Sequence, residues 1–174
     1  MIFYTADLHL FHKNIISMCN RPFESLEMMH QVIAENWNHV VADEDEVYIV
    51  GDVCLKFNTE TELYLKALHG RKHLITGNHD KAHLKKENFR NLFASISNYS
   101  EIRDENRKVI LFHYPILEWD GYFRDTYHVY GHIHNSDNNF ANQIVKQKQF
   151  KNAFNAGVDV NHFTPKILTE WINN

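Results

Sequence analysis

Cysteine, long apolar runs and an excess of basic charge are all scarce in this sequence of 174 residues. Its two cysteines, Cys19 and Cys54, are too few for a disulfide framework and suit a reducing compartment in which thiols stay free. No stretch of about 18 apolar residues occurs, so we expect no membrane-spanning helix. The opening segment MIFYTADLHL has neither a basic region nor a small-residue cleavage site, so we expect no signal peptide and a cytoplasmic location.

The charge balance also argues against a protein that binds duplex nucleic acid. The formal net charge is −4 with histidine neutral, and no basic stripe is present. A content of 44% hydrophobic and 23% charged residues is ordinary for a globular protein, and the length suits one domain spanning residues 1–174. There are neither internal repeats nor low-complexity segments. Histidine, by contrast, is plentiful, with thirteen residues in the chain.

The hydrophobic pattern predicts strands and helices that alternate in the first half of the chain. Residues 25–41 carry apolar side chains on one helical face, and Ser25 is a suitable N-cap. The second half reads largely as hairpins, so we expect an α/β protein. The expected strands are 2–6, 47–50, 73–76, 95–103, 108–114, 127–130, 152–158 and 166–172. The expected helices are 25–41, 59–70 and part of 81–93, and the expected loose loop is 142–152.

Polar residues follow five of these strands at the point where each strand ends. Each of Gly51, Gly77 and Gly131 directly precedes one of these polar groups, and glycine lets the backbone approach a ligand closely. Ligands bind beyond the carboxyl ends of strands in open α/β sheets, so the five groups are expected to converge. The groups are Asp7 with His9, Asp52, Asn78 with His79 and Asp80, His113, and His132 with His134.

Imidazole and carboxylate groups in this number point to divalent metal ions. A single Asp-x-His or Gly-His-x-His is more often a structural turn or a satisfied buried histidine. Five such groups in order along the chain are hard to explain as unrelated turns. A tetrahedral site needs four ligands, and seven with one shared carboxylate suit two metals about 3.5–4 Å apart. The seven candidate ligands are Asp7, His9, Asp52, Asn78, His113, His132 and His134.

The motifs DLH, GD, GNHD, LFHYP and GHIH, in this order over residues 7–134, resemble those of the calcineurin-like metallophosphoesterases. The resemblance implies a four-layer sandwich, with two mixed β-sheets packed face to face and flanked by helices. It also implies a phosphate-ester hydrolase with two divalent ions, for which we expect Mn²⁺, with Zn²⁺, Fe, Ni²⁺ or Mg²⁺ as alternatives. The first ion would be held by Asp7, His9, Asp52 and His134, and the second by Asp52, Asn78, His113 and His132.

Two further residues of the GNHD motif receive catalytic roles. His79 is not needed as a ligand and is expected to donate a proton to the leaving group. Asp80 is expected to hold the ring of His79, as carboxylates orient imidazoles in other sites.

The residues that contact substrate are less defined by the sequence. Arg21 can offer a bidentate fork to a phosphate or can be a solvated residue before Pro22. His12 can touch substrate or lie on the surface. The aromatic side chains of residues 113–123 can stack on a nucleobase or simply pack the loop. Asp159 is placed like a residue that supports a metal ligand.

The expected substrate is a small phosphate ester, and we favour a phosphodiester related to a nucleotide. Phosphomonoesterase and nuclease activity are the alternatives, because the motif residues do not separate these reactions. A non-catalytic scaffold with the same fold is the alternative from another class. Such scaffolds lack the catalytic histidine and some ligands, whereas this chain retains His79 and all seven candidate ligands.

Overall fold

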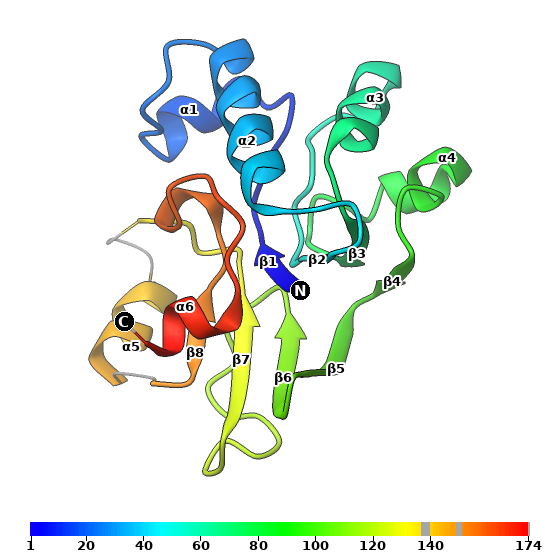
Figure 1. Cartoon of the computed structure of the whole chain (residues 1–174). Helices are drawn as coiled ribbons and strands as arrows, with labels where there is room; N and C mark the ends of the chain where they lie inside the picture. The colour runs from blue at the N-terminus through cyan, green and yellow to red at the C-terminus, as the bar shows by residue number, and fades with distance from the viewer. Residues whose placement is uncertain (137–139, 149–150, 174) are drawn as a thin grey trace.

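The computed structural model describes residues 1–136, 140–148 and 151–173, and contains two four-stranded sheets (Figure 1). The strands of the first sheet all pair in parallel, in the order β1 (Ile2–Thr5), β2 (Glu46–Ile49), β3 (Arg71–Ile75) and β4 (Ser95–Ser97). The second sheet has the order β5 (Tyr99–Asp104), β6 (Arg107–Phe112), β7 (Thr126–Tyr130) and β8 (Ala153–Asn155). In it β5 runs antiparallel to β6, and the other pairs are parallel.

The helices flank these two sheets (Figure 1). In Figure 1 the first four α-helices lie above the first sheet, whereas α5 and α6 lie beside β8. The helices are α1 (Ile15–Met18), α2 (Leu26–Val40), α3 (Thr59–Ala67), α4 (Glu87–Arg90), α5 (Phe140–Lys148) and α6 (Leu168–Ile172). Two 3₁₀ turns are η1 (His83–Lys85) and η2 (Val158–Val160).

Side chains that alternate along the strands of the first sheet point into two separate layers of the core. Phe3 points into the cluster shared with the helices, whereas Tyr4 points into the cluster shared with the second sheet. Val109 and Val129 of the second sheet complete that inner cluster. Successive strand residues face opposite sides, so each sheet strand serves both layers. The predicted fold class, two sheets face to face with helices outside, is confirmed.

Helix α2 forms where the sequence predicts it. Met29, Ile33 and Trp37 are its buried residues and recur at the spacing of one helical face. The hydroxyl oxygen of Ser25 accepts a hydrogen bond from the backbone N–H of Met28 at 3.2 Å. This bond satisfies one of the free N–H groups of the first turn.

Several details of both sheets differ from the prediction. The first sheet is parallel rather than mixed, and β5–β6 is the one hairpin among the described strand pairs. The predicted strand 95–103 is two strands, because the chain leaves the edge of the first sheet at Asn98 and joins the edge of the second.

Two predicted non-helical segments are helical. Residues 166–172, expected as a strand, contain α6, because Leu168, Trp171 and Ile172 enter the inner cluster at helical spacing. The expected loose loop 142–152 instead contains most of α5. Its residues 149–150 lie outside the described residues. The amide of Asn142 donates hydrogen bonds to the carbonyl oxygens of Ile133 and Ser136 and fixes the start of this helix.

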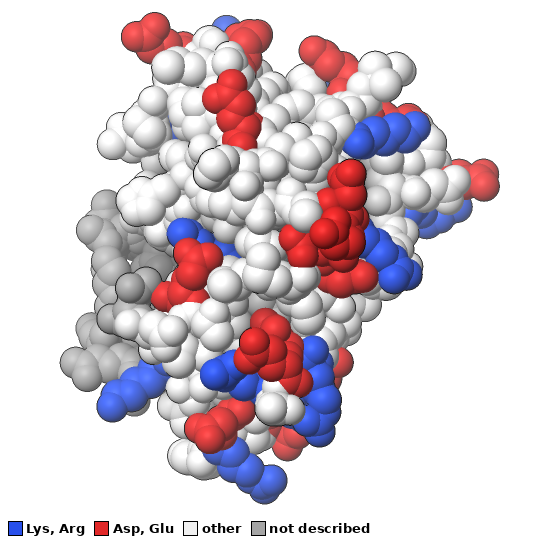
Figure 2. All heavy atoms as spheres, viewed as in Figure 1, with Lys and Arg blue, Asp and Glu red and all other residues white. Residues whose placement is uncertain are grey.

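Within the described residues no helix is both long enough and apolar enough to cross a bilayer. Figure 2 shows acidic and basic side chains in neighbouring positions over the face seen in Figure 1, rather than one basic stripe.

Candidate metal centre

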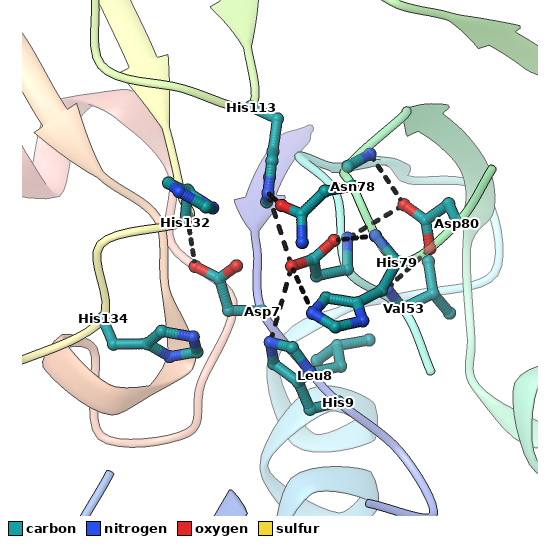
Figure 3. A network of polar contacts seen from close by, with 12 residues as sticks. Asp7, Leu8, His9, Val53, Asn78, His79, Asp80, His113, His132 and His134 are labelled. Atoms are coloured by element: carbon teal, nitrogen blue, oxygen red, sulfur yellow. Dashed lines mark hydrogen bonds and ion pairs between the residues drawn. The ribbon is translucent and has the colours of Figure 1, made fainter. Parts of the chain in front are cut away.

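The loops that follow five strands meet at the carboxyl ends of both sheets (Figure 3). Asp7, Asp52 and Asn78 follow β1, β2 and β3 of the first sheet. His113 follows β6 and His132 follows β7 of the second sheet. The predicted convergence of polar groups at strand ends therefore occurs, and both sheets contribute to it.

The candidate ligands form two compact groups. The ligand atoms of Asp7, His9 and His134 lie within 4.8 Å of one another, and so do those of Asp52, His113 and His132. His9, Asp52 and His79 form a further group that meets the same limit. The seventh candidate, Asn78, places its side-chain oxygen 3.2 Å from Nε2 of His113, on the side of the second group.

Asp52 lies between the two groups. Its Oδ2 atom is 3.6 Å from Nε2 of His9 and 3.4 Å from Nε2 of His113. Its Oδ1 atom accepts a hydrogen bond from the backbone N–H of His79 at 2.9 Å. One carboxylate oxygen therefore faces ligands of both groups, while the other is fixed by the GNHD loop.

The backbone at these residues is strained. Asp7, His9, Asp52, His132 and His134 all have φ between 48° and 72°. Non-glycine residues adopt this left-handed region infrequently, and such conformations persist only where the surrounding structure holds them. Five of the seven candidate ligands share it, which indicates that the fold maintains the loops in the shape that makes their side chains converge.

Two of the glycines are required by close packing around the ligands. A Cβ atom on Gly51 would lie 2.2 Å from Nδ1 of His113, and φ at this glycine is +89°. A Cβ atom on Gly77 would lie 2.2 Å from Oδ1 of Asp52. Each glycine therefore leaves room for a ligand supplied by another strand.

Buried polar atoms without partners show that this centre fits a cation. Oδ1 of Asp7 and both ring nitrogens of His9 are buried and have no hydrogen-bond partner. An unsatisfied buried polar group costs roughly 1–3 kcal/mol. Burial raises the pKa of Asp7 to about 7 and lowers the pKa of His9 to about 3. A divalent ion among these atoms would accept their lone pairs and offset the carboxylate charge.

The pKa of Asp52, the other carboxylate of the centre, is held well below its usual range. Burial would raise the pKa of Asp52, but hydrogen bonding and charge from His113, together with the N–H of His79, lower it to about 2. Asp52 is therefore the anionic centre around which the imidazoles gather.

Asp80 has a role other than the one predicted from the sequence. Its Oδ2 accepts the backbone N–H groups of Asp52 at 2.9 Å and Gly77 at 2.8 Å, and its Oδ1 accepts that of Val53 at 3.0 Å. The carboxylate is buried and ties the loops after β2 and β3 together. It therefore holds the backbone beside His79 rather than the His79 ring.

Arg21 is also corrected by the structure. Its side chain is fully buried, so it is neither the fork toward a substrate phosphate nor the solvated residue that the sequence allows. Nε lies 2.7 Å from Oδ1 of Asp159, and Nη2 donates to the carbonyl oxygen of Asp7 at 2.8 Å. Because every edge of the guanidinium is engaged inside the protein, it does not reach a substrate. Asp159, expected to support a ligand, accepts a hydrogen bond from Nδ1 of His134 at 2.7 Å.

Of the other candidate substrate residues, two border the centre and one packs the loop. The ring of His12 lies 5.5 Å from that of His9, and its buried Nδ1 has no partner. The ring of Tyr114 lies 4.5 Å from that of His132. Trp119, in contrast, is buried and donates its indole N–H to the carbonyl oxygen of Thr126. His12 and Tyr114 therefore border the centre, whereas Trp119 packs the loop.

Sequence reasoning missed Asn155. Its side-chain nitrogen donates to the carbonyl oxygen of His134 at 3.1 Å, and its side-chain oxygen accepts the N–H of Gly157 at 2.8 Å. The available signal was a strand, 153–155, that ends in Asn before Ala and Gly, much as the other strand ends carry polar residues beside glycine.

The two facing sheets and the imidazole–carboxylate groups at their common edge define the class, an α/β protein with a candidate metal centre at its strand ends. Residues 1–171 match the family model of the calcineurin-like phosphoesterases. The chain belongs to this family, and its activity is metal-dependent hydrolysis of phosphate esters. The family also implies divalent metal ions as cofactors.

Two relatives of this chain match it over most of its length, and a third over about half. It is 32% identical over 173 residues to an uncharacterised protein of Methanocaldococcus jannaschii, covering 96% of this chain and 86% of that protein. A solved structure of a protein of unknown function from Aquifex aeolicus is similar, with a TM-score of 0.75, 29% identity and coverage of 95% of this chain and 94% of that one. The gene 66 protein of Mycobacterium phage L5 is 33% identical over 84 residues, covering 46% of this chain and 40% of that protein.

Proposed function

We propose that this protein is a dinuclear phosphodiesterase that hydrolyses small, nucleotide-like phosphate esters. The position of Asp52 carries the proposal. Its Oδ2 atom lies 3.6 Å from a nitrogen of His9 in one ligand group and 3.4 Å from a nitrogen of His113 in the other. A carboxylate shared in this way suits two ions rather than one.

The proposed ligands are those that the family resemblance implies. Asp7, His9, Asp52 and His134 would hold one ion, and Asp52, Asn78, His113 and His132 would hold the other. We propose Mn²⁺, because mixed imidazole and carboxylate ligands suit first-row divalent metals. Bound divalent ions supply Lewis acidity, which activates water at neutral pH and offsets charge on the phosphoryl oxygens.

His79 is the proposed general acid. Its Nε2 lies 4.0 Å from Oδ2 of Asp52, and 39% of its side chain is exposed, so one side of the ring is open to a substrate. The hydrogen bond from its backbone N–H to Asp52 holds the His79 backbone at the edge of the centre. From this position it would donate a proton to the departing ester oxygen.

His12 and the aromatic ring of Tyr114 are the proposed substrate contacts. They border opposite groups of ligands, His12 next to His9 and Tyr114 next to His132. An imidazole can bond a phosphoryl oxygen, and a tyrosine ring offers a face for a nucleobase.

The burial of Arg21 supports a diester rather than a monoester. The transferred phosphate of a monoester carries more charge, and it gains more from an additional guanidinium. Arg21 is engaged with Asp159 and with backbone carbonyl oxygens, and so does not supply that charge. A diester has less charge to neutralise.

Metal content and substrate preference test this function together. The protein is reconstituted with Mn²⁺, its metal is counted by elemental analysis, and it is assayed on bis-p-nitrophenyl phosphate, p-nitrophenyl phosphate, cyclic nucleotides and single-stranded DNA. We expect two ions per chain and the highest kcat/KM on a small diester. Preference for the monoester or for DNA would replace the substrate class, and one ion per chain would contradict the dinuclear centre.

The proposed location is the cytoplasm. Cys19 and Cys54 are both free and buried, which suits a compartment that keeps thiols reduced.

A further inference from the structure

Arg21 makes more contacts than a residue that only fills space. Its guanidinium donates to both oxygens of Asp159, at 2.7 and 3.2 Å, and to the sulfur of Met29 at 3.3 Å. It also donates to the carbonyl oxygens of Asp7 at 2.8 Å and Leu8 at 3.0 Å. The side chains of Arg21 and Asp159 are both completely buried. Such a pair is tolerated only when its remaining hydrogen-bonding groups are satisfied, as they are here.

The backbone that Arg21 holds is the strained backbone of the first motif. Asp7 has φ of 57°, and its carbonyl oxygen receives one of the guanidinium bonds. Arg21 lies 14 residues further along the chain, in the turn after α1, so the contact is not a consequence of local geometry. It links this turn to the loop that carries two candidate ligands of one group.

Asp159 transmits the same constraint to a ligand from the other sheet. One of its oxygens accepts a hydrogen bond from Nδ1 of His134 at 2.7 Å. Because a carboxylate only accepts, Nδ1 must carry the proton, which leaves Nε2 of His134 for an ion. Asn155 holds the carbonyl oxygen of the same residue at 3.1 Å, so His134 is fixed at its ring and at its backbone.

The geometry assigns to Arg21 and Asp159 the role of a positioning pair that presets one of the two ion sites. The pair fixes Asp7 and His134, which lie far apart in the sequence. With His9 these two residues make the first ligand group. The second group, Asp52, His113 and His132, receives no bond from either residue among the described contacts. This inference rests on the proposed dinuclear function. It adds that the pair presets only one of the two ion sites.

Asp159→Asn tests the pair because it keeps the size of the side chain and removes its charge. The matched control is Asp104→Asn, a half-buried carboxylate that accepts the hydroxyl of Tyr4 at 2.9 Å at the opposite end of the sheets. Mn²⁺ binding is measured by titration calorimetry on the wild type and both variants. We expect the affinity for one ion to fall about 10- to 100-fold in Asp159→Asn and the other affinity to stay unchanged. Asp104→Asn should bind both ions as the wild type does.

Arg21→Lys gives a second, milder perturbation. It keeps a positive charge beside Asp159 but loses the fixed fork, so the same ion should bind more weakly. Excess Mn²⁺ should restore hydrolysis in this variant, whereas loss of a substrate contact would not respond to metal. An Arg21→Lys protein with raised KM and unchanged Mn²⁺ affinity would overturn the assignment.

A measurement on the wild type keeps the inference testable if the variants fail to fold. In ¹⁵N NMR spectra of the Zn²⁺-loaded protein, with His134 assigned by His134→Gln, we expect a protonated Nδ1 and a metal-bound Nε2. Binding through Nδ1 would overturn the inference. Fewer than two ions in the wild type would contradict the proposed function, whereas two ions with equal affinities in Asp159→Asn and wild type would contradict only the positioning pair.

Discussion

Four buried aspartates surround the centre, and their partners separate their roles. Asp80 is satisfied by three backbone N–H groups, and Asp159 by Arg21 and His134. Asp7 and Asp52 are also buried, yet the carboxylate of neither has a lysine or arginine partner among its described contacts. Because buried carboxylates need a countercharge, these two are the ones whose charge a bound metal ion would neutralise.

The proposed proton-donor role of His79 predicts a specific kinetic loss. His79→Ala should keep two Mn²⁺ ions and lose about 10²–10⁴-fold in kcat on esters with a poor leaving group. The loss should be smaller on p-nitrophenyl esters, because that leaving group departs without a proton. The comparison is His39→Ala, which removes an exposed histidine on α2. A variant that loses an ion would show that His79 is a ligand instead.

The contact between Gly77 and Asp52 predicts that a single methyl group disturbs the centre. In Gly77→Ala the new Cβ would lie 2.2 Å from Oδ1 of Asp52, so the carboxylate must move. We expect at least a tenfold lower affinity for Mn²⁺, measured by equilibrium dialysis. Gly121→Ala is the control, because it introduces a similar clash, 2.3 Å from Oγ1 of Thr126, in the loop before β7. Equal metal affinity in the two variants would contradict this reading.

The placement of the candidate ligands at strand ends was predictable from sequence, but the residues that support them were not. Asp7 and Asp52 follow apolar runs, and the position of a strand end is a local property of the chain. The partners of Arg21 and Asp80 lie 138 and 28 residues away, and a sequence does not state which distant groups a side chain meets. The sequence therefore allows Arg21 to be a substrate contact or a solvated residue, although it is buried behind the first motif.

At the scale of helices and strands, the predictions are confirmed where the hydrophobic pattern of the sequence agrees with the packing in the structure. Helix α2 shows one apolar face and an N-cap, and both are present in the structure. Helix α6 is short, and its sequence predicts a strand, because an apolar run of this length does not distinguish the two. The strand pairs β6–β7 and β7–β8 are parallel, and their crossovers were not recognisable as such in sequence.

His128 on β7 predicts how the stability of the second sheet depends on pH. Its Nε2 accepts the N–H of Ile116 at 3.2 Å, and its Nδ1 is 3.1 Å from the carbonyl oxygen of Ile110. Burial lowers the pKa of His128 to about 4, below the unfolded value near 6.5. The unfolded chain therefore takes up a proton that the folded chain does not. The stabilisation is complete above pH 6.5 and is lost as the pH falls toward 4.

Denaturant unfolding of the metal-free protein between pH 4 and 7 measures this effect. We expect the free energy of unfolding of His128→Phe to depend less on pH than that of the wild type, by up to about 3 kcal/mol over this range. His39→Gln, at an exposed position, should retain the wild-type slope. Parallel curves for His128→Phe and the wild type would show that His128 is not the group responsible.

At the scale of the molecule, the centre joins the two sheets. Asp7, Asp52 and Asn78 come from the first sheet, and His113 and His132 from the second. The sheets also share an apolar layer that includes Tyr4 and Val129. The α/β class was predictable from the order of strands and helices along the chain, and the two-sheet sandwich from the family resemblance, whereas the strand pairing depends on crossovers with no distinctive residues. A metal bound at this junction should strengthen the contact between the sheets.

Removal of metal should therefore lower the stability of the whole fold. Each ion that binds only the folded protein adds about 2.7 kcal/mol at a free concentration of 100 times its Kd. For a chain of this length that corresponds to roughly 5–10 °C in Tm. Differential scanning calorimetry with Mn²⁺ and with chelator measures the difference. Asp52→Asn should show a similar Tm in both conditions, because it lacks the charge shared by the two groups. An unchanged Tm for the wild type after chelation would contradict a metal bound between the sheets.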